Sequence, residues 1–102
     1  MITRMWEARA VPGRAADLAA WAAATQLPPG AGGLLGGRAY LSLDGPDRVV
    51  VIADWRDEAA LAAFAGPGWR TAAPVDAAGE ALLAGPARVW HFVPQAVGTV
   101  HG

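Results

Sequence analysis

The sequence has no cysteine, no lysine and no asparagine among its 102 residues. Without cysteine the chain cannot form disulfides, thiolate metal sites or a cysteine nucleophile. Its basic residues are eight arginines against nine acidic residues, a net charge of −1, so no basic surface predicts a nucleic-acid partner or binding to an acidic membrane. No unbroken apolar run reaches the ~18 residues of a membrane span, and no signal-like run precedes the first charges. These absences predict a soluble, cytoplasmic protein.

The residues that are abundant are small and apolar. Hydrophobic residues make up 54% of the chain and charged residues 17%, and 25 residues are alanine. This composition is the opposite of that of a disordered chain, and the length suits one domain. Glycine and proline interrupt the sequence at 12–13, 28–33, 44–47, 66–68 and 85–86.

The segments between these breaks have readable periods. Alternating residues predict strands, and apolar residues at helical spacing predict helices. The expected strands are 2–11, 34–43, 48–55 and 87–94, and the expected helices are 14–26, a short helix capped by Asp57 and ending at Ala65, and one from near Pro74 to the break at 85–86. The order β-α-β-β-α-β is typical of the ferredoxin-like α+β fold, a four-stranded antiparallel sheet with helices on one face. The predicted domain is 1–94, followed by a tail, 95–102.

The third expected strand carries information about assembly. Residues 49–53 are five apolar residues in succession, whereas a strand with one solvated face alternates apolar and polar residues. Helices cover one face, and the chain is too short to cover the other. A second copy packed sheet against sheet satisfies the pattern, so we expect a homodimer, with the tail contacting the partner subunit.

This pattern resembles the antibiotic biosynthesis monooxygenase-like family of dimeric α/β barrels. The features that carry the resemblance are Val11-Pro12-Gly13 before a helix, a glycine-rich loop before the second strand, and a third strand that ends in Trp55. Trp55 is followed by an acidic helix cap and then by Phe64. The resemblance covers residues 1–94. It implies a cofactor-independent monooxygenase that converts an aromatic polyketide-like substrate to an anion, which then reacts directly with O2. At two positions where those oxygenases have asparagine and tyrosine, this chain has Val51 and Leu61.

The side chains that suit such a reaction are few. Trp55 is expected to line the cleft between sheet and helices. Trp69 and Arg70 lie together in a loop, and His91, as a neutral imidazole, suits proton transfer near pH 7. The expected catalytic residues are therefore Trp55, Arg70 and His91, and the expected substrate-binding residues are Trp69, Tyr40, Arg38, Phe64, Val51 and Leu61. For each of them a structural role, in the core or in an ion pair, is the alternative.

Other chemistry has little support in the sequence. The two histidines, His91 and His101, have no metal-ligand spacing, and a single serine argues against a serine triad. No metal or organic cofactor is predicted. The alternative function is a non-catalytic, small-molecule-binding dimer of the same fold. A cavity lined by Trp55, with a polar group pointing into it, would favour the enzyme. A cavity filled by Trp69, Phe64 and Leu82 would favour neither the enzyme nor the binding protein.

Overall fold

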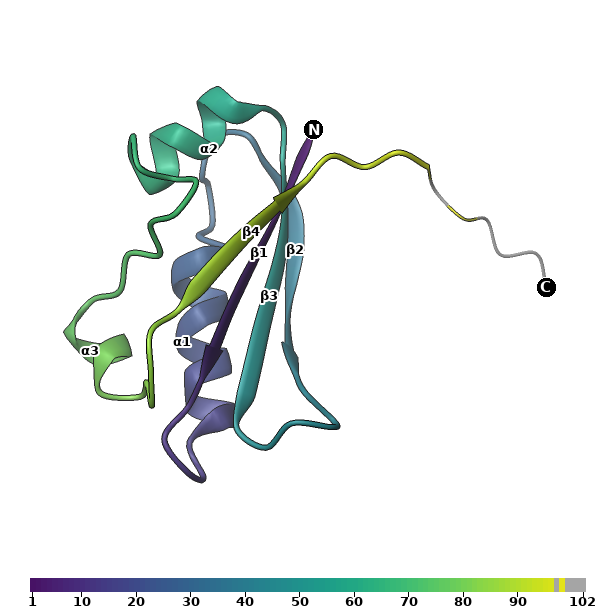
Figure 1. Ribbon diagram of the computed structural model, residues 1–102. Helices are drawn as coiled ribbons and strands as arrows, with labels where there is room; N and C mark the ends of the chain where they lie inside the picture. The colour runs from purple at the N-terminus through teal and green to yellow at the C-terminus, as the bar shows by residue number, and fades with distance from the viewer. Residues whose placement is uncertain (97, 99–102) are drawn as a thin grey trace.

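The computed structural model describes residues 1–96 and 98 as one sheet with helices packed on it. The elements are β1 (Ile2–Arg9), α1 (Ala15–Gln26), β2 (Leu34–Leu41), β3 (Arg48–Trp55), α2 (Glu58–Ala65), α3 (Ala77–Glu80) and β4 (Arg88–Phe92). The strands lie in the order β2-β3-β1-β4, and every neighbouring pair is antiparallel (Figure 1). No helix in this part of the chain is long and apolar enough to cross a membrane.

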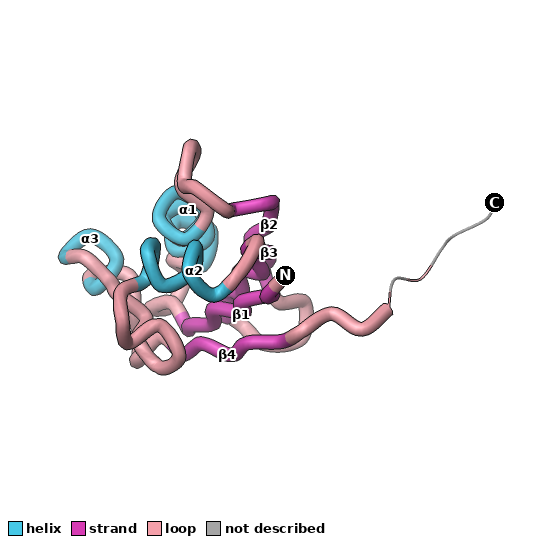
Figure 2. Tube along the Cα trace, turned by 90° about the horizontal axis from the view of Figure 1, so that it is seen from above, coloured by secondary structure: helices cyan, strands magenta, loops and turns pink. Residues whose placement is uncertain are grey.

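All the helices lie on one side of the sheet, as Figure 2 shows from above. The predicted α+β, ferredoxin-like fold is thus confirmed. The predicted cap of α2 is also present, since the Asp57 carboxylate accepts a hydrogen bond from the Ala60 amide at 2.8 Å. This backbone bond, more than the neighbouring Arg56, lowers the pKa of Asp57.

The face of the sheet that meets the helices carries the core. Trp6, Val49, Val51 and Trp55 are all 1% exposed or less. They alternate along β1 and β3, as strand geometry requires of residues on one face. Arg4 shares this face and is also buried, at 2% exposed. Along β1 and β3 the inner face is therefore apolar apart from one arginine.

The opposite face is covered by no other element of the described chain. Met5 pairs with Ile52 on one side and with Trp90 on the other, so apolar side chains run across three strands. We call this surface the outer apolar face; its residues are Met5, Val50, Ile52, Trp90 and Phe92. Trp90 and Phe92 are 39% and 52% exposed.

Two local predictions have different outcomes. The pair Gly36-Gly37 predicts a bulge or a close backbone approach near the start of the second strand, and a register shift between Leu34 and Gly36 confirms it. A Cβ on Gly37 would lie 2.5 Å from the Leu27 side chain, so glycine permits the close approach of α1's end. The helix predicted from Pro74 to the break at 85–86 is wrong in length, because only Ala77–Glu80 is helical. The helix begins at Ala77, later than predicted, and its N-cap is Asp76, whose side chain accepts a hydrogen bond from the Gly79 amide at 2.9 Å.

The predicted tail begins after β4. The chain continues away from the sheet past Phe92 (Figure 1), and residues 95, 96 and 98 are exposed. The predicted contact of 95–102 with a partner depends largely on residues 97 and 99–102, which lie outside the described residues.

Candidate functional site

A cavity of about 380 Å³ opens between the two longer helices and the loop that leads to α3. We call it the α1–α2 cavity. It is lined by Trp21, Thr25, Gln26, Phe64, Ala65, Pro74, Val75 and Asp76. Its walls combine two aromatic rings with an amide, a hydroxyl and a carboxylate. This composition suits a small molecule that is mostly apolar and carries a few polar atoms.

Trp21 forms one wall and is fixed at its edge. Its indole N–H donates to the Asp76 carboxylate at 3.0 Å, and the same carboxylate oxygen caps α3. The Trp21 ring also packs against Trp6, with 6.0 Å between ring centroids. A Cβ on Gly79 would lie 2.4 Å from the Trp21 ring, so α3 closes tightly behind it. Because its N–H is already satisfied, Trp21 offers the cavity an apolar ring held in place.

Phe64 is the second aromatic side chain of the lining, and its ring packs against that of Trp55. The two rings are stacked with centroids 4.8 Å apart and planes 27° apart. Trp55 itself is fully buried and is not among the residues that line the α1–α2 cavity. Its indole nitrogen has no hydrogen-bond partner in the described structure. A ligand in the α1–α2 cavity would therefore touch Phe64 and not Trp55 itself.

Gln26 is the buried polar group of the cavity. The residue is 5% exposed, and its one side-chain hydrogen bond in the described structure is a long one, from Nε2 to the Thr25 hydroxyl at 3.5 Å. That hydroxyl donates in turn to the Trp21 carbonyl at 3.0 Å. A carboxamide can donate two hydrogen bonds and accept two, so most of its capacity is unused.

A second cluster lies where β1 and β4 meet the loop after α2. Arg4 donates from Nη1 to the Trp69 carbonyl at 2.6 Å and from Nη2 to the Ala72 carbonyl at 2.8 Å. It has no carboxylate partner among the described residues. Burial lowers the pKa of Arg4 to about 10, which leaves it protonated at neutral pH. The cluster thus holds a buried positive charge that pins the loop to the sheet.

Arg4 also determines the protonation state of His91. Its Nη1 lies 3.0 Å from His91 Nε2, and because a guanidinium can only donate, Nε2 is the acceptor. The remaining proton of the neutral ring is then on Nδ1. Burial, and after it the positive charges of Arg4 and Arg70, lower the pKa of His91. His91 is therefore a neutral hydrogen-bond donor at Nδ1.

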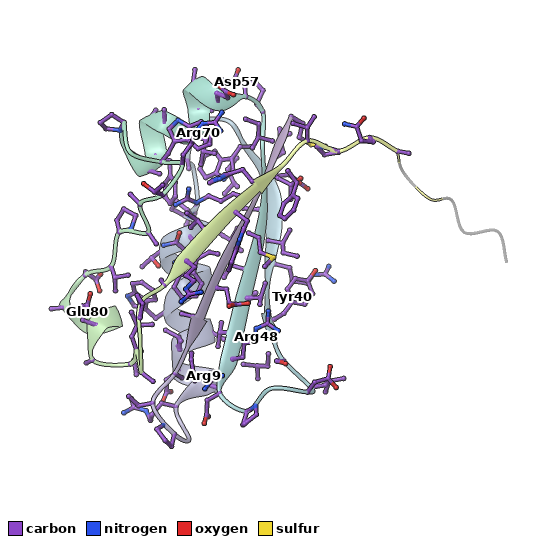
Figure 3. All side chains as sticks on the ribbon, in the orientation of Figure 1. Arg9, Tyr40, Arg48, Asp57, Arg70 and Glu80 are labelled. Atoms are coloured by element: carbon purple, nitrogen blue, oxygen red, sulfur yellow. The ribbon has the colours of Figure 1, made fainter. Side chains whose placement is uncertain are left out.

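Trp69 and Arg70 complete this cluster. The Trp69 ring meets His91 edge-on at 4.8 Å, and the Arg70 guanidinium lies 4.9 Å above the same ring. Arg70 is exposed beside α2 (Figure 3), with Glu58 3.8 Å away. A small hollow of about 120 Å³ adjoins these residues. It is lined by Ile2, Glu58, Trp69, Arg70, His91, Phe92 and Val93. This volume is too small for a polycyclic molecule.

The other predicted site residues lie elsewhere. Arg38 and Tyr40 pair with Ile52 and Val50 and so lie on the outer side of the sheet, where Figure 3 labels Tyr40. Val51 and Leu61 are buried at 1% and 0% exposure, in two separate core clusters. None of these residues lines the α1–α2 cavity.

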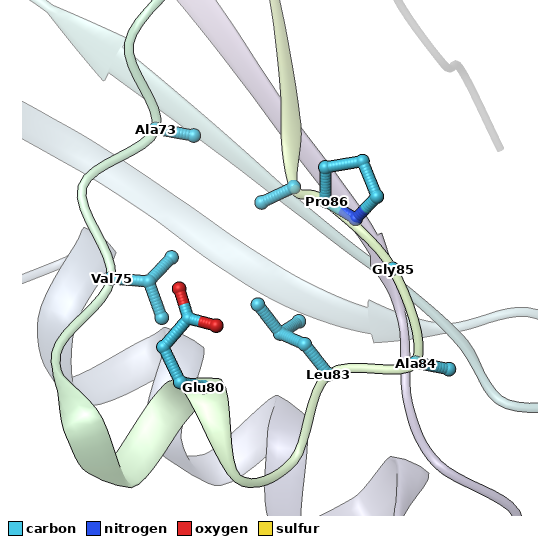
Figure 4. A pocket seen from close by; sticks show the side chains of 8 residues that line it. Ala73, Val75, Glu80, Leu83, Ala84, Gly85 and Pro86 are labelled. Carbon is cyan, nitrogen blue, oxygen red and sulfur yellow. The ribbon is translucent and has the colours of Figure 1, made fainter.

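A larger hollow, of about 460 Å³, lies beside α3 and is drawn in Figure 4. Val75, Glu80 and Leu83 point toward its centre, and the rest of its lining is alanine, glycine and proline. It has no aromatic ring and its single ionisable group, Glu80, is exposed. Volume alone would favour this hollow, but its lining offers a ligand little to recognise. Among the described residues, no group of three His, Asp or Glu side chains is placed to hold a metal ion.

Sequence reasoning missed Arg4 and Gln26, although each carries a signal. Arg4 alternates with Trp6 and so shares its inward face. Gln26 continues the helical stripe of Leu18 and Ala22 at four-residue steps. In both cases a polar side chain occupies a position that the period assigns to the core. Such a position predicts a buried polar group that needs a partner.

The fold and the cavity together define a small α+β domain with an aromatic-lined cavity between α1, α2 and the loop that leads to α3. The sequence matches the family Antibiotic biosynthesis monooxygenase over residues 1–75. The chain therefore belongs to the antibiotic biosynthesis monooxygenase family. Among curated proteins, none matches the chain.

Solved structures share this fold over nearly their whole length. A candidate antibiotic biosynthesis monooxygenase from Bordetella bronchiseptica is 27% identical, with a TM-score of 0.69 over 93% of this chain and 97% of that one. A monooxygenase from Streptomyces coelicolor, solved with the ligand nanaomycin D, is 19% identical, with a TM-score of 0.75 over 98% of this chain and 92% of that one. A Nitrosomonas europaea protein of unknown function is 23% identical, with a TM-score of 0.68 over 99% and 95%.

Proposed function

We propose that this protein is a cofactor-independent monooxygenase whose substrate is an aromatic polyketide-like molecule bound in the α1–α2 cavity. The observation that carries the proposal is the lining of that cavity, where Trp21 and Phe64 offer ring surface and Gln26 offers a buried amide. Its volume, about 380 Å³, falls in the range of roughly 300–1,000 Å³ common for small-molecule sites. Family membership supports an oxygenase reaction, and the ligand of the Streptomyces coelicolor relative supports an aromatic substrate.

The proposed reaction needs neither a metal nor a flavin. A phenolic or enolic substrate loses a proton to solvent, and the resulting carbanion-like anion passes one electron to O2. The substrate radical and superoxide combine into a peroxide, which takes up a proton and then loses water. The net change converts a CH2 group and O2 into C=O and H2O, so that both electron pairs come from the two C–H bonds. The protein has to bind the ring system, favour the anion and exclude bulk water.

The buried positive charge of Arg4 favours an anion over a neutral substrate that reaches the cluster of Arg4, Trp69 and His91. Arg4 is a cation without a carboxylate partner in the described structure, in an interior where charges interact more strongly than in water. His91 presents an Nδ1 donor, not a base, because Arg4 occupies its Nε2. His91 and Arg70 line the small hollow beside Trp69 and not the α1–α2 cavity. Their proposed catalytic roles therefore require a substrate that extends from the cavity into that hollow. The proposal gives Arg38 and Tyr40 no substrate contact.

We also propose that the working form is a homodimer, joined through the outer apolar face. Trp90 and Phe92 expose large apolar surface next to Met5 and Ile52, and a contiguous apolar patch marks an interface. Sedimentation of the wild type should give a dimer, and Ile52→Asp should give a folded monomer. A monomeric wild type would contradict this part of the proposal and leave the cavity unaffected.

The reaction is tested by O2 uptake with anthrone, followed by mass spectrometry of the product. With dioxygen carrying the heavy oxygen isotope, the expected product is anthraquinone with one labelled oxygen. The controls are anthrone alone, since it oxidises slowly in air, and the matched pair Thr25→Phe and Ala24→Phe. Thr25 lines the cavity, whereas Ala24 is its exposed neighbour on α1.

Thr25→Phe should reduce uptake to the rate without protein, and Ala24→Phe should retain the wild-type rate. If anthrone and a panel of naphthols bind but consume no O2 above background, the protein is the alternative, a non-catalytic binding protein. Equal uptake by the two variants would contradict the placement of the reaction in the α1–α2 cavity.

A further inference from the structure

The buried amide of Gln26 has more hydrogen-bonding capacity than the protein uses. Gln26 is 5% exposed, yet its side chain makes one hydrogen bond in the described structure, and that bond is long, at 3.5 Å. Among the described residues, the buried side-chain atoms without a partner are Arg4 Nε, Trp6 Nε1 and Trp55 Nε1, and no Gln26 atom is among them, so the Gln26 amide faces the open space of the cavity. An amide that faces a cavity with most of its hydrogen-bonding capacity unused is placed to pair with a ligand.

Among the polar side chains that line the cavity, Gln26 is the buried one with hydrogen-bonding capacity left for a ligand. The Thr25 hydroxyl is engaged with the Trp21 carbonyl at 3.0 Å. One Asp76 oxygen accepts from both Trp21 and Gly79, at 3.0 and 2.9 Å, and Asp76 is exposed at the rim. Phe64, Ala65, Pro74 and Val75 contribute no polar side-chain atom.

We propose that Gln26 is the specificity-determining residue of the α1–α2 cavity and that its amide donates a hydrogen bond to a ring oxygen of a planar aromatic ligand. This inference rests on the proposed function for the identity of the site, and it adds the chemical group that the site selects. The ligand lies with its rings between Trp21 and Phe64 and with a carbonyl or enolate oxygen at Gln26. A polycyclic hydrocarbon fills the same space but leaves the amide unpaired, so the cavity discriminates against it.

The amide also suits the reaction. On conversion of the substrate to its anion, negative charge develops on the ring oxygen, and a hydrogen bond to a charged acceptor is stronger than one to a neutral carbonyl. The same contact therefore binds the anion more tightly than the neutral substrate, which is the condition for lowering the barrier. Gln26 thus acts on both affinity and rate, whereas an apolar contact acts on affinity alone.

The test compares two probes of similar shape, anthraquinone and anthracene, of which only the first has ring oxygens. Binding is followed by quenching of tryptophan fluorescence, since Trp21 lines the cavity. The variants are Gln26→Leu, and Gln26→Met as a second replacement that keeps the side-chain length. Gln95→Leu is the matched control, because Gln95 is exposed after β4 and far along the chain from the cavity.

The wild type should bind anthraquinone more tightly than anthracene, and loss of one hydrogen bond should weaken anthraquinone binding about threefold to tenfold. Anthracene affinity should stay the same or rise, since the unpaired amide is gone. Gln95→Leu should match the wild type with both probes. If a Gln26 variant fails to fold, as judged by its melting transition, the other variant decides.

The outcomes separate this inference from the proposed function. Unchanged discrimination in the Gln26 variants, or equal affinity of the wild type for the two probes, overturns the role of Gln26 and retains the cavity as a binding site. Absence of binding of either probe to the wild type overturns both. Loss of discrimination with retained O2 uptake confirms recognition by Gln26 and limits its effect to binding.

Discussion

The two faces of the sheet carry similar side chains with opposite environments. On the inner face Trp6 and Trp55 are 1% and 0% exposed, whereas Trp90 on the outer face is 39% exposed. The two faces alternate along the same strands, and Val49 and Val50 are consecutive residues with different burial. The inner face is covered by helices of its own chain, so its apolar residues account for stability. The outer face lacks such cover, so its apolar residues are best explained by association.

The faces also differ in how they hold an arginine. Arg4 on the inner face is buried and donates to two loop carbonyls, while Arg38 on the outer face is exposed. Neither has a carboxylate partner among the described residues. The inner arginine therefore joins sheet to loop, and the outer one is solvated.

The largest expected effect is that of Trp55→Ala, which should lower the free energy of unfolding by about 3–5 kcal/mol because it empties a fully buried site. Trp90→Ala should cost about 1 kcal/mol or less in the dissociated chain. Urea unfolding at two protein concentrations distinguishes the two variants, since Trp90→Ala should make the unfolding midpoint less dependent on protein concentration. Equal destabilisation by the two variants would remove the distinction between the faces.

Arg4→Met should lower the free energy of unfolding by about 2–4 kcal/mol, because the Trp69 and Ala72 carbonyls lose their donor. Arg38→Met, at the exposed position, should stay within about 0.5 kcal/mol of the wild type. Chemical denaturation measures both variants. A small effect of Arg4→Met would show that water replaces the guanidinium, and so that the loop does not depend on it.

Gly79→Ala should lower stability by about 1–2 kcal/mol, since its Cβ would lie 2.4 Å from the Trp21 ring. The displaced ring should also weaken anthraquinone binding in the α1–α2 cavity. Gly85→Ala is the matched control, with no atom within 4 Å of its added Cβ. Thermal melting and titration together measure the two effects. Unchanged binding in Gly79→Ala would mean that Trp21 is not a wall for the ligand.

The smallest expected effect is a pH dependence from His91, whose folded-state pKa is lowered from 6.5. Below pH 6.5 the unfolded chain takes up a proton that the folded chain resists, so stability should fall with falling pH until the folded pKa is passed. His91→Gln should show a shallower fall over this range. Urea midpoints at a series of pH values give the comparison, and identical slopes would contradict the lowered pKa.

Several features could be predicted from the residues themselves. The apolar run 49–53, which follows the turn at 44–47, identified β3, and Asp57 identified the start of α2, because both signals act over a few residues. The third predicted helix was too long because Pro74 and alanines suit a helix locally. The packing of Gly79 against Trp21 and the Asp76 cap fixed its start and its four-residue length. Trp55 shows the same limit, since the family resemblance predicted its place between sheet and helices, but its stacking against Phe64 depends on where α2 lies.

The sequence by itself determined the order of strands and helices and the absence of thiol chemistry, because periodicity and composition are local properties. Only the tertiary structure decided which polar groups are buried together. Arg4 meets His91 across 87 positions of sequence, and Trp21 meets Asp76 across 55. No local pattern specifies contacts between residues so far apart in the sequence, because such contacts depend on where the chain reverses and on how the helices pack on the sheet. The cavity wall that holds Gln26 arises from those same contacts, so its chemistry became visible only in the folded chain.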